Sequence, residues 1–182
     1  MMRGLFFDVQ PKPGHMDHYF DHVARLKPIL ARHTGLSFLD RYRPLDDAGA
    51  LLSHQLWADD AAIKAWRADP EHRRSQSAGI KVHFDDYRIR VGKLIDAHTT
   101  HTLPSDTRLL IAAYGPGPID LAAGRAYESV NHQGQFLMLA TAHDPSTATA
   151  LLAAADTQGA DTLRLFAIDR DYTLTDRHEA PN

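Results

Sequence analysis

The fold is decided by one stretch in the first half of the chain, LSFLDRYRPLDDAGALLSHQLW, residues 36–57. Apolar and polar side chains alternate over residues 36–42, and such alternation predicts a half-buried strand. Residues 44–49 contain proline and glycine and predict a turn, and residues 50–57 predict the next strand. The stretch therefore predicts two consecutive strands of one sheet.

A strand and a long helix are predicted before this stretch. Leu5–Val9 is a short apolar run ended by Pro11 and Pro13, which is typical of a strand. Apolar residues then recur at helical spacing within an arc of about 120° and predict an amphipathic helix that Gly35 closes. Pro28 is expected to kink this helix or to separate its last turn. The apolar positions are Met16, Tyr19, Phe20, Val23, Leu26 and Leu30.

Two short helices are predicted after the stretch. Asp59 or Asp60 is suited to cap the first of them. Asp69 and Pro70 form a second start signal, with the aspartate as N-cap and the proline at the first helical position. Gly79 is expected to end this second helix.

The order of elements predicts an α+β fold with two related parts. Residues 87–91 alternate and predict a fourth strand, so residues 1–95 form one ferredoxin-like β-α-β-β-α-β unit with an antiparallel sheet. Residues 96–107 are polar and are interpreted as a linker. Residues 108–178 are interpreted as a shorter, degenerate ferredoxin-like half; the alternative is one extended α+β domain with extra strands. The predicted elements are strand 109–114, helix 119–126, hairpin strands 127–132 and 135–142, helix 146–157 and strand 162–173.

The composition excludes several classes of function. Within the 182 residues the net charge is −3 and both signs are interspersed, so nucleic-acid binding is not expected. The absence of cysteine excludes disulfides, thiolate nucleophiles and cysteine-ligated clusters. No apolar run approaches the roughly 20 residues that a membrane helix needs, and residues 1–8 are too short an apolar run for a signal peptide. A cytoplasmic protein is therefore expected.

Three segments resemble one known family. They are WADDAAIKAWRADPEHRRSQ (residues 57–76), FDDYRIRV (residues 84–91) and the pair Pro13-Gly14, and together they resemble the antibiotic biosynthesis monooxygenase family of dimeric α/β barrels. The resemblance covers about residues 4–95. It implies a four-stranded sheet with helices on one face, whose other face meets a second sheet to form a barrel. The partner sheet is expected from a homodimer or, as an intrachain pseudo-dimer, from the second half of this chain.

The resemblance also implies possible activities. Members of the family oxidise polycyclic phenols with molecular oxygen and without metal or flavin, or they degrade haem. The haem-degrading branch would require an asparagine on the first strand, a tryptophan on the second helix and a histidine ten residues later. Phe7, Trp66 and Gln76 stand at these positions, so haem degradation is disfavoured and no cofactor is expected.

Three residues are candidates for catalysis. Trp66 can stack a flat aromatic substrate, or it can be a core residue of an amphipathic helix. His72 follows a helix start, where a neutral imidazole is favoured, and can accept a proton from a phenol; a capping or surface histidine is the alternative. His54 lies on an apolar strand face between Leu52 and Leu56, where it either lines a cavity or is satisfied in the core.

Four further polar residues are candidates for binding the substrate. Asp8, Tyr42 and either Arg88 or Arg90 can reach the open face of the sheet, and the strand register is expected to choose between the two arginines. His15, His18 and His22 share a helix flank, but they are interpreted as surface histidines and no metal site is expected.

The sequence thus favours a cofactor-independent monooxygenase-like oxidoreductase acting on a small aromatic or polyketide-like molecule. In this hypothesis Trp66 is the pocket wall, His72 or His54 is the base, and Tyr42 and an arginine of 87–91 orient the anion. The alternative is a non-catalytic protein of the same fold that binds a small ligand or oligomerises under stress. Two or more polar groups converging beside Trp66 would favour the enzyme, and a purely apolar lumen would favour the alternative.

Overall fold

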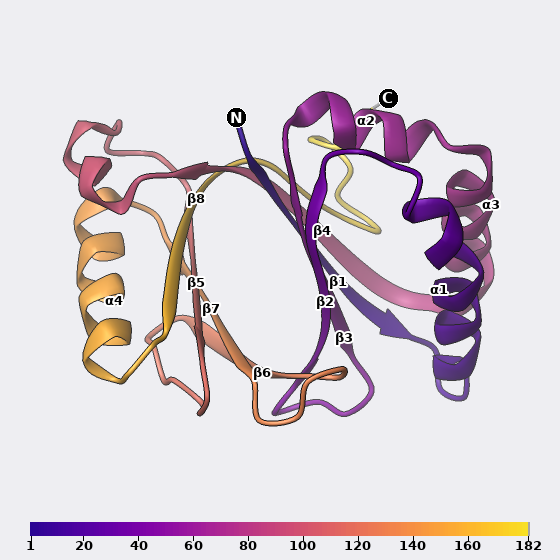
Figure 1. Ribbon diagram of the computed structural model, residues 1–182, viewed down its shortest axis with the longest axis horizontal. Helices are drawn as coiled ribbons and strands as arrows, with labels where there is room; N and C mark the ends of the chain where they lie inside the picture. Colours follow the sequence, from indigo (N-terminus) through magenta and orange to yellow (C-terminus); the bar gives the residue numbers. More distant parts are fainter. Residues whose placement is uncertain (182) are drawn as a thin grey trace.

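Eight antiparallel strands form a closed barrel in the computed structural model, which describes residues 1–181. Around the barrel the strands follow the order β1-β3-β2-β6-β7-β5-β8-β4 (Figure 1). The predicted fold class is confirmed: each half contributes a four-stranded antiparallel sheet of ferredoxin-like type. The strands are β1 (Arg3–Pro11), β2 (Leu36–Pro44), β3 (Leu51–Trp57), β4 (Phe84–Ile95), β5 (Leu109–Gly115), β6 (Gly124–Ser129), β7 (Phe136–Ala142) and β8 (Thr162–Thr173).

Helices cover the barrel on two opposite sides. The helices α1, α2 and α3 lie against the sheet of the first half, and α4 lies against the sheet of the second half (Figure 1). A π-helical turn, η1, joins α3 to β4, and a 3-10 helix, η2, follows β4. Their bounds are α1 (Met16–Leu30), α2 (Asp60–Ala68), α3 (Pro70–Ala78), η1 (Gly79–His83), η2 (Ala97–Thr102) and α4 (Pro145–Thr157).

Local signals set the ends of the short helices, as predicted. The Asp59 side chain accepts a hydrogen bond from the backbone N–H of Ala62 and caps α2. Asp69 caps α3 through the N–H groups of Glu71 and His72. In contrast, α1 continues through Pro28 to Leu30.

The barrel closes within one chain. One edge of the first sheet pairs β2 with β6, with Pro44 opposite Tyr127, and the other edge pairs β4 with β8 over residues 88–95. The second half therefore supplies the partner sheet that two-chain barrels take from another subunit.

Two predictions for the second half are wrong. Residues 119–126 are not a helix, and the strand that was predicted over 127–132 already begins at Gly124 and ends at Ser129. Ile119 and Leu121 are instead buried from a loop, and Ala123 has a positive φ of 54° that no helix accommodates. Residues 96–107 contain η2, whose buried Thr100 lies 3.2 Å from the Thr149 hydroxyl of α4.

Each strand of the first half divides its side chains between two environments. Phe6, Leu52 and Leu56 point into the barrel and pack with residues of the second half such as Phe166. The alternate residues point toward the helices, where Val91 packs with Trp57, Ile63 and Trp66. Because the period of a strand is two, this division decides which polar residues can share a site.

Candidate functional site

A cavity of about 450 Å³ lies between α1, α2 and α3 and the helix-covered face of the first sheet. This volume lies in the range typical of small-molecule sites. Its walls are largely apolar, and they also carry side chains able to bind polar groups. The apolar lining includes Leu5, Phe7, Val23, Leu26, Leu39, Ile63, Trp66, Ile89 and Val91, and the polar lining includes Tyr19, Arg41, Ser53, Gln55, Arg67, His72, Ser75 and Gln76.

Trp66 and His72 meet in this cavity. Their rings are stacked, with centroids 4.1 Å apart and planes 26° apart. The His33 ring meets the indole edge-on at 5.1 Å, and its Nε2 lies 3.2 Å from the Asp69 carboxylate. The Asp69 side chain thus makes two kinds of contact at the turn between α2 and α3. It caps α3, and it also pairs with His33. Trp66 itself is only 5% exposed and belongs to the core packing as well as to the cavity wall.

His72 is an uncharged imidazole. Burial lowers the pKa of His72 to about 4, and the Trp66 carbonyl and the Asp69 carboxylate oppose only part of this shift. The Nδ1 atom is buried and has no hydrogen-bond partner within residues 1–181. The side chain is therefore free to accept a proton, although it is a weaker base than ordinary histidine.

The structure places His54 elsewhere. It is fully buried inside the barrel, where Phe6 stacks on it at 4.3 Å. Its Nδ1 lies 3.3 Å from the Leu5 carbonyl, which can only accept, so the unprotonated Nε2 accepts from the Tyr114 hydroxyl at 2.6 Å. Burial lowers the pKa of His54 to about 3. Both nitrogens are thus occupied by contacts within the barrel.

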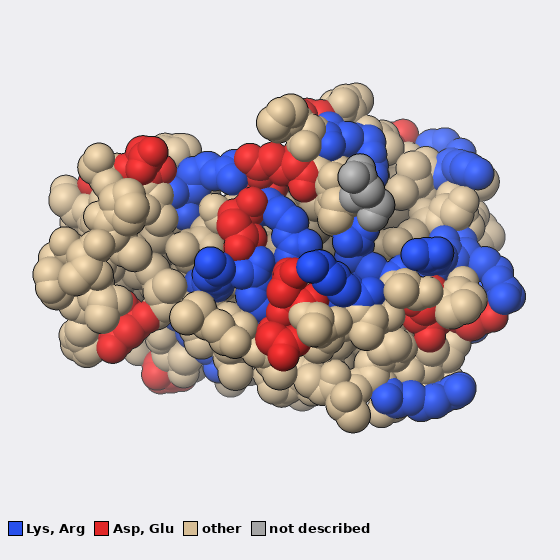
Figure 2. Space-filling view, turned by 90° about the horizontal axis from the view of Figure 1, so that it is seen from above, with Lys and Arg blue, Asp and Glu red and all other residues tan. Residues whose placement is uncertain are grey.

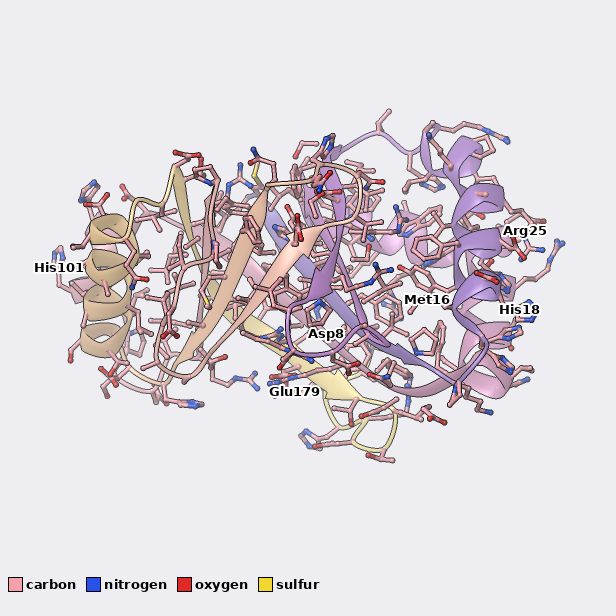
Figure 3. The ribbon with its side chains drawn as sticks, turned by 90° about the horizontal axis from the view of Figure 1, so that it is seen from below. Asp8, Met16, His18, Arg25, His101 and Glu179 are labelled. Carbon is pink, nitrogen blue, oxygen red and sulfur yellow. The ribbon has the colours of Figure 1, made fainter. Side chains whose placement is uncertain are left out.

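Asp8, Arg90 and Tyr42 also lie inside the barrel. Asp8 binds Arg90 at 2.9 Å and accepts a hydrogen bond from the Tyr127 hydroxyl at 3.0 Å. Burial and then the Asp40 carboxylate raise the pKa of Tyr42. Figure 3 shows Asp8 in the middle of the barrel, away from α1 with its labelled Met16, His18 and Arg25.

The expectation that register would choose between Arg88 and Arg90 is wrong. The two residues are two positions apart in β4, so their side chains project from the same face. Arg90 is buried, whereas Arg88 is exposed and forms a two-point ion pair with Asp171 at 2.8 and 2.6 Å. The structure therefore brings Trp66 and His72 together, and separates both from His54, Asp8, Tyr42, Arg88 and Arg90.

Sequence reasoning missed several polar residues of the cavity, among them Tyr19 and Arg41. Tyr19 was assigned to the apolar stripe of α1, and its buried hydroxyl faces the same space. Arg41 lies two residues after Leu39 on β2, so the alternation of residues 36–42 already placed it on the same face as an apolar residue. What the alternation left open was which face the helices cover.

Four histidines gather at one end of the helix layer. His83 of η1 joins His15, His18 and His22, and the Nδ1 atoms of His15 and His83 are 3.0 Å apart. Across residues 1–181, no group of three or more His, Asp or Glu residues is arranged to hold a metal ion.

The positions that would bind haem in the related branch lie in the same cavity. Phe7, Trp66 and Gln76 all line it. A phenyl ring and an amide are not among the ligands that hold haem iron, so the positions that the resemblance assigns to haem degradation do not fit it. His72, which also lines the cavity, lies four residues before Gln76, about one helical turn away.

The fold and this cavity define the class of protein, a ferredoxin-like α/β barrel with a ligand-sized space under its helices. Residues 2–78 match the family described as antibiotic biosynthesis monooxygenase. This match confirms, over most of the first half of the chain, the resemblance seen in the sequence.

Solved structures with a similar arrangement include PA3566 from Pseudomonas aeruginosa, with 18% identity, 52% of this chain and 95% of that chain covered, and a TM-score of 0.46. Rv0793 from Mycobacterium tuberculosis is 14% identical, the match covers 53% of this chain and 97% of that chain, and the TM-score is 0.48. The match to a candidate monooxygenase from Lactobacillus acidophilus NCFM covers 95% of this chain and 96% of that chain, with 5% identity and a TM-score of 0.47. No curated protein matches the chain.

Among the described residues, no helix is long and apolar enough to cross a membrane.

Proposed function

We propose that the cavity under α1, α2 and α3 is the active site of a cofactor-independent monooxygenase that oxidises a small aromatic or polyketide-like molecule. The observation that carries this proposal is the stacked pair of Trp66 and His72 on the wall of an apolar cavity of about 450 Å³. A planar aromatic substrate can pack against these apolar and aromatic walls. A neutral imidazole can accept the proton that a phenol loses when it ionises.

His72 is the proposed base. The phenol proton passes to the imidazole, and the resulting carbanion-like anion reacts with oxygen. One oxygen atom stays on the substrate carbon as a carbonyl, and the other leaves as water with two substrate hydrogens, so the substrate supplies the electrons. The pKa of about 4 belongs to the empty cavity. An anion formed beside the ring favours the protonated imidazole and raises this pKa when it is needed.

The apolar walls have a second proposed role. They exclude water from the anionic intermediate, so that it reacts with oxygen rather than taking back a proton. His54 is not proposed as a base, because both its nitrogens are engaged inside the barrel.

Oxygen consumption by the metal-free protein tests this proposal, with a panel of anthrones and dihydroxynaphthalenes. We expect uptake from at least one substrate, a fall of roughly 10²–10⁴-fold in His72→Gln, and loss in Trp66→Ala. His101→Gln is the matched control, since His101 is exposed and lies beside α4 (Figure 3). Unchanged turnover in His72→Gln and Trp66→Ala would remove the assignment.

A second candidate function is the binding of a small ligand without chemistry. It is favoured by the low pKa of His72 and by the 5% exposure of Trp66, which leave a weak base and little free indole surface. Absence of uptake across the panel from folded protein, together with binding of the same aromatics, would support this candidate over the enzyme.

A further inference from the structure

We infer that the cavity selects an apolar molecule bearing one carboxylate, and that Arg41 of β2 binds that carboxylate. The inference rests on the proposed function for the location of the site, but the binding chemistry stands on separate observations.

The charge lining the cavity has one sign. Lys27, Arg41, Arg67 and Arg170 line it, and no Asp or Glu of residues 1–181 does so. The net charge of the whole chain is −3, so the excess of cations is local to the cavity. Figure 2 shows Lys and Arg over the first half and, interleaved with Asp and Glu, at the junction between the halves, whereas the end formed by α4 carries few charged residues on this face.

Arg41 differs from the other strand arginines on the same side of the sheet. Arg3 binds Asp169 at 2.7 Å, and Arg170 pairs with Asp60. Arg41 is half-buried and forms no ion pair within residues 1–181, so its buried Nε, which like that of Arg3 has no hydrogen-bond partner, lacks the carboxylate that Arg3 has beside it. A guanidinium N–H withdrawn from water costs free energy unless an acceptor compensates it. The missing partner is therefore expected to come from the ligand.

The surroundings of Arg41 favour a carboxylate. The guanidinium is planar and offers paired N–H donors that match the two oxygens of a carboxylate. It lies beside the Tyr19 hydroxyl, whose pKa burial raises and Arg41 partly lowers again, so that Tyr19 stays protonated and can donate a further hydrogen bond. Arg170 is neutralised by Asp60, and Lys27 is exposed at the surface. Arg67 also forms no ion pair within residues 1–181, but its guanidinium donates to the Pro181 carbonyl at 3.3 Å. Arg41, whose Nε has no partner in this part of the chain, therefore suits a single negative charge attached to an apolar body.

Calorimetric titration with 2-naphthoate, its neutral analogue 2-naphthamide and the phenol 2-naphthol tests this inference. None of the three needs to be oxidised for binding to be measured. We expect 2-naphthoate to bind at least about tenfold more tightly than the other two at pH 7, where 2-naphthol is uncharged. In Arg41→Gln this preference should disappear through weaker naphthoate binding alone, whereas Arg41→Lys should keep part of it. Arg43→Gln is the matched control, because Arg43 is exposed on the same strand and does not line the cavity.

The melting temperature of the ligand-free variants separates a binding role from a structural one. Because Arg41 forms no ion pair within residues 1–181, Arg41→Gln should melt within about 2–4 °C of the parent. Equal binding of naphthoate and naphthamide by the parent, or a large fall in melting temperature in Arg41→Gln, would overturn the inference. Oxygen uptake is independent of this result: an intact preference for naphthoate without any uptake would overturn the proposed function and leave the carboxylate site standing.

Discussion

At the scale of single residues, the first half holds two neutral histidines with different surroundings. His72 faces the cavity with an unpartnered Nδ1, whereas His54 is held between the Leu5 carbonyl and the Tyr114 hydroxyl. Both have a pKa below the ordinary value near 6.5, because burial disfavours the charged imidazole. A lowered pKa is therefore found both at His72, the proposed base, and at His54, whose ring only makes contacts inside the barrel.

The low pKa of His54 predicts an acid-sensitive fold. In the unfolded chain His54 takes up a proton below about pH 6.5, whereas in the folded chain it stays neutral down to about pH 3. The unfolded state thus binds more protons in this window, and the free energy of unfolding falls as the pH decreases. Between pH 7 and pH 5 we expect this residue to contribute about 2 kcal/mol of the loss.

Urea titrations of the parent and His54→Gln at pH 7 and pH 5 measure this contribution, since glutamine keeps an acceptor for Tyr114. The variant should lose less stability than the parent between the two pH values. His101→Gln, at an exposed position, should behave like the parent. The same pH dependence in the parent and in His54→Gln would contradict the prediction.

At the scale of elements, two helices begin with the same signal but have different neighbours. Asp69 and Asp144 each cap a helix that starts with proline, α3 beside the cavity and α4 on the second half. We expect Asp69→Ala and Asp144→Ala each to lower the melting temperature by about 2–4 °C. Only Asp69→Ala should also reduce oxygen uptake, because this cap positions His72 against Trp66. Equal effects of the two variants on uptake would show that the cap stabilises α3 without positioning the base.

At the scale of the whole molecule, barrel closure within one chain predicts a monomer. Both edges of the first sheet are already paired, β2 with β6 and β4 with β8, so no edge remains for the strands of a second chain. Light scattering on the eluting protein should give a mass near 20.3 kDa. A particle of twice that mass would mean that another surface joins two complete barrels.

In the second half the helix packs directly on the sheet, whereas in the first half a cavity lies between the helices and the sheet. Ala148, Leu152 and Ala155 of α4 pack directly on Leu109 and Ile111 of the sheet. This close packing uses the sheet face whose counterpart in the first half borders the cavity. We therefore propose that the first half supplies most of the ligand-binding cavity, to which the second half adds Arg170 and Tyr172 of β8.

The sequence by itself determined the order of elements in the first half and the starts of its short helices. Apolar periodicity and the aspartate caps act between residues a few positions apart, so they are readable without knowledge of the fold. It also carried the family resemblance, whose segment 57–76 contains both Trp66 and His72. In the second half the local signals were misleading. Ile119 and Leu121 are buried in the core from a loop, so their apolar side chains reflect tertiary packing and not the periodicity of a helix.

Only the tertiary structure decided which candidates share a site. Alternation assigns residues to one of two faces of a strand, but it does not state which face the helices cover. His54 is paired with Tyr114, 60 positions away, and Asp8 with Tyr127, 119 positions away. These contacts exist because the second sheet closes over the lumen face. The same closure leaves Arg41, on the opposite face, beside the cavity and without a carboxylate of the chain, since the carboxylates that pair with strand arginines on that face lie near Arg3 and Arg170.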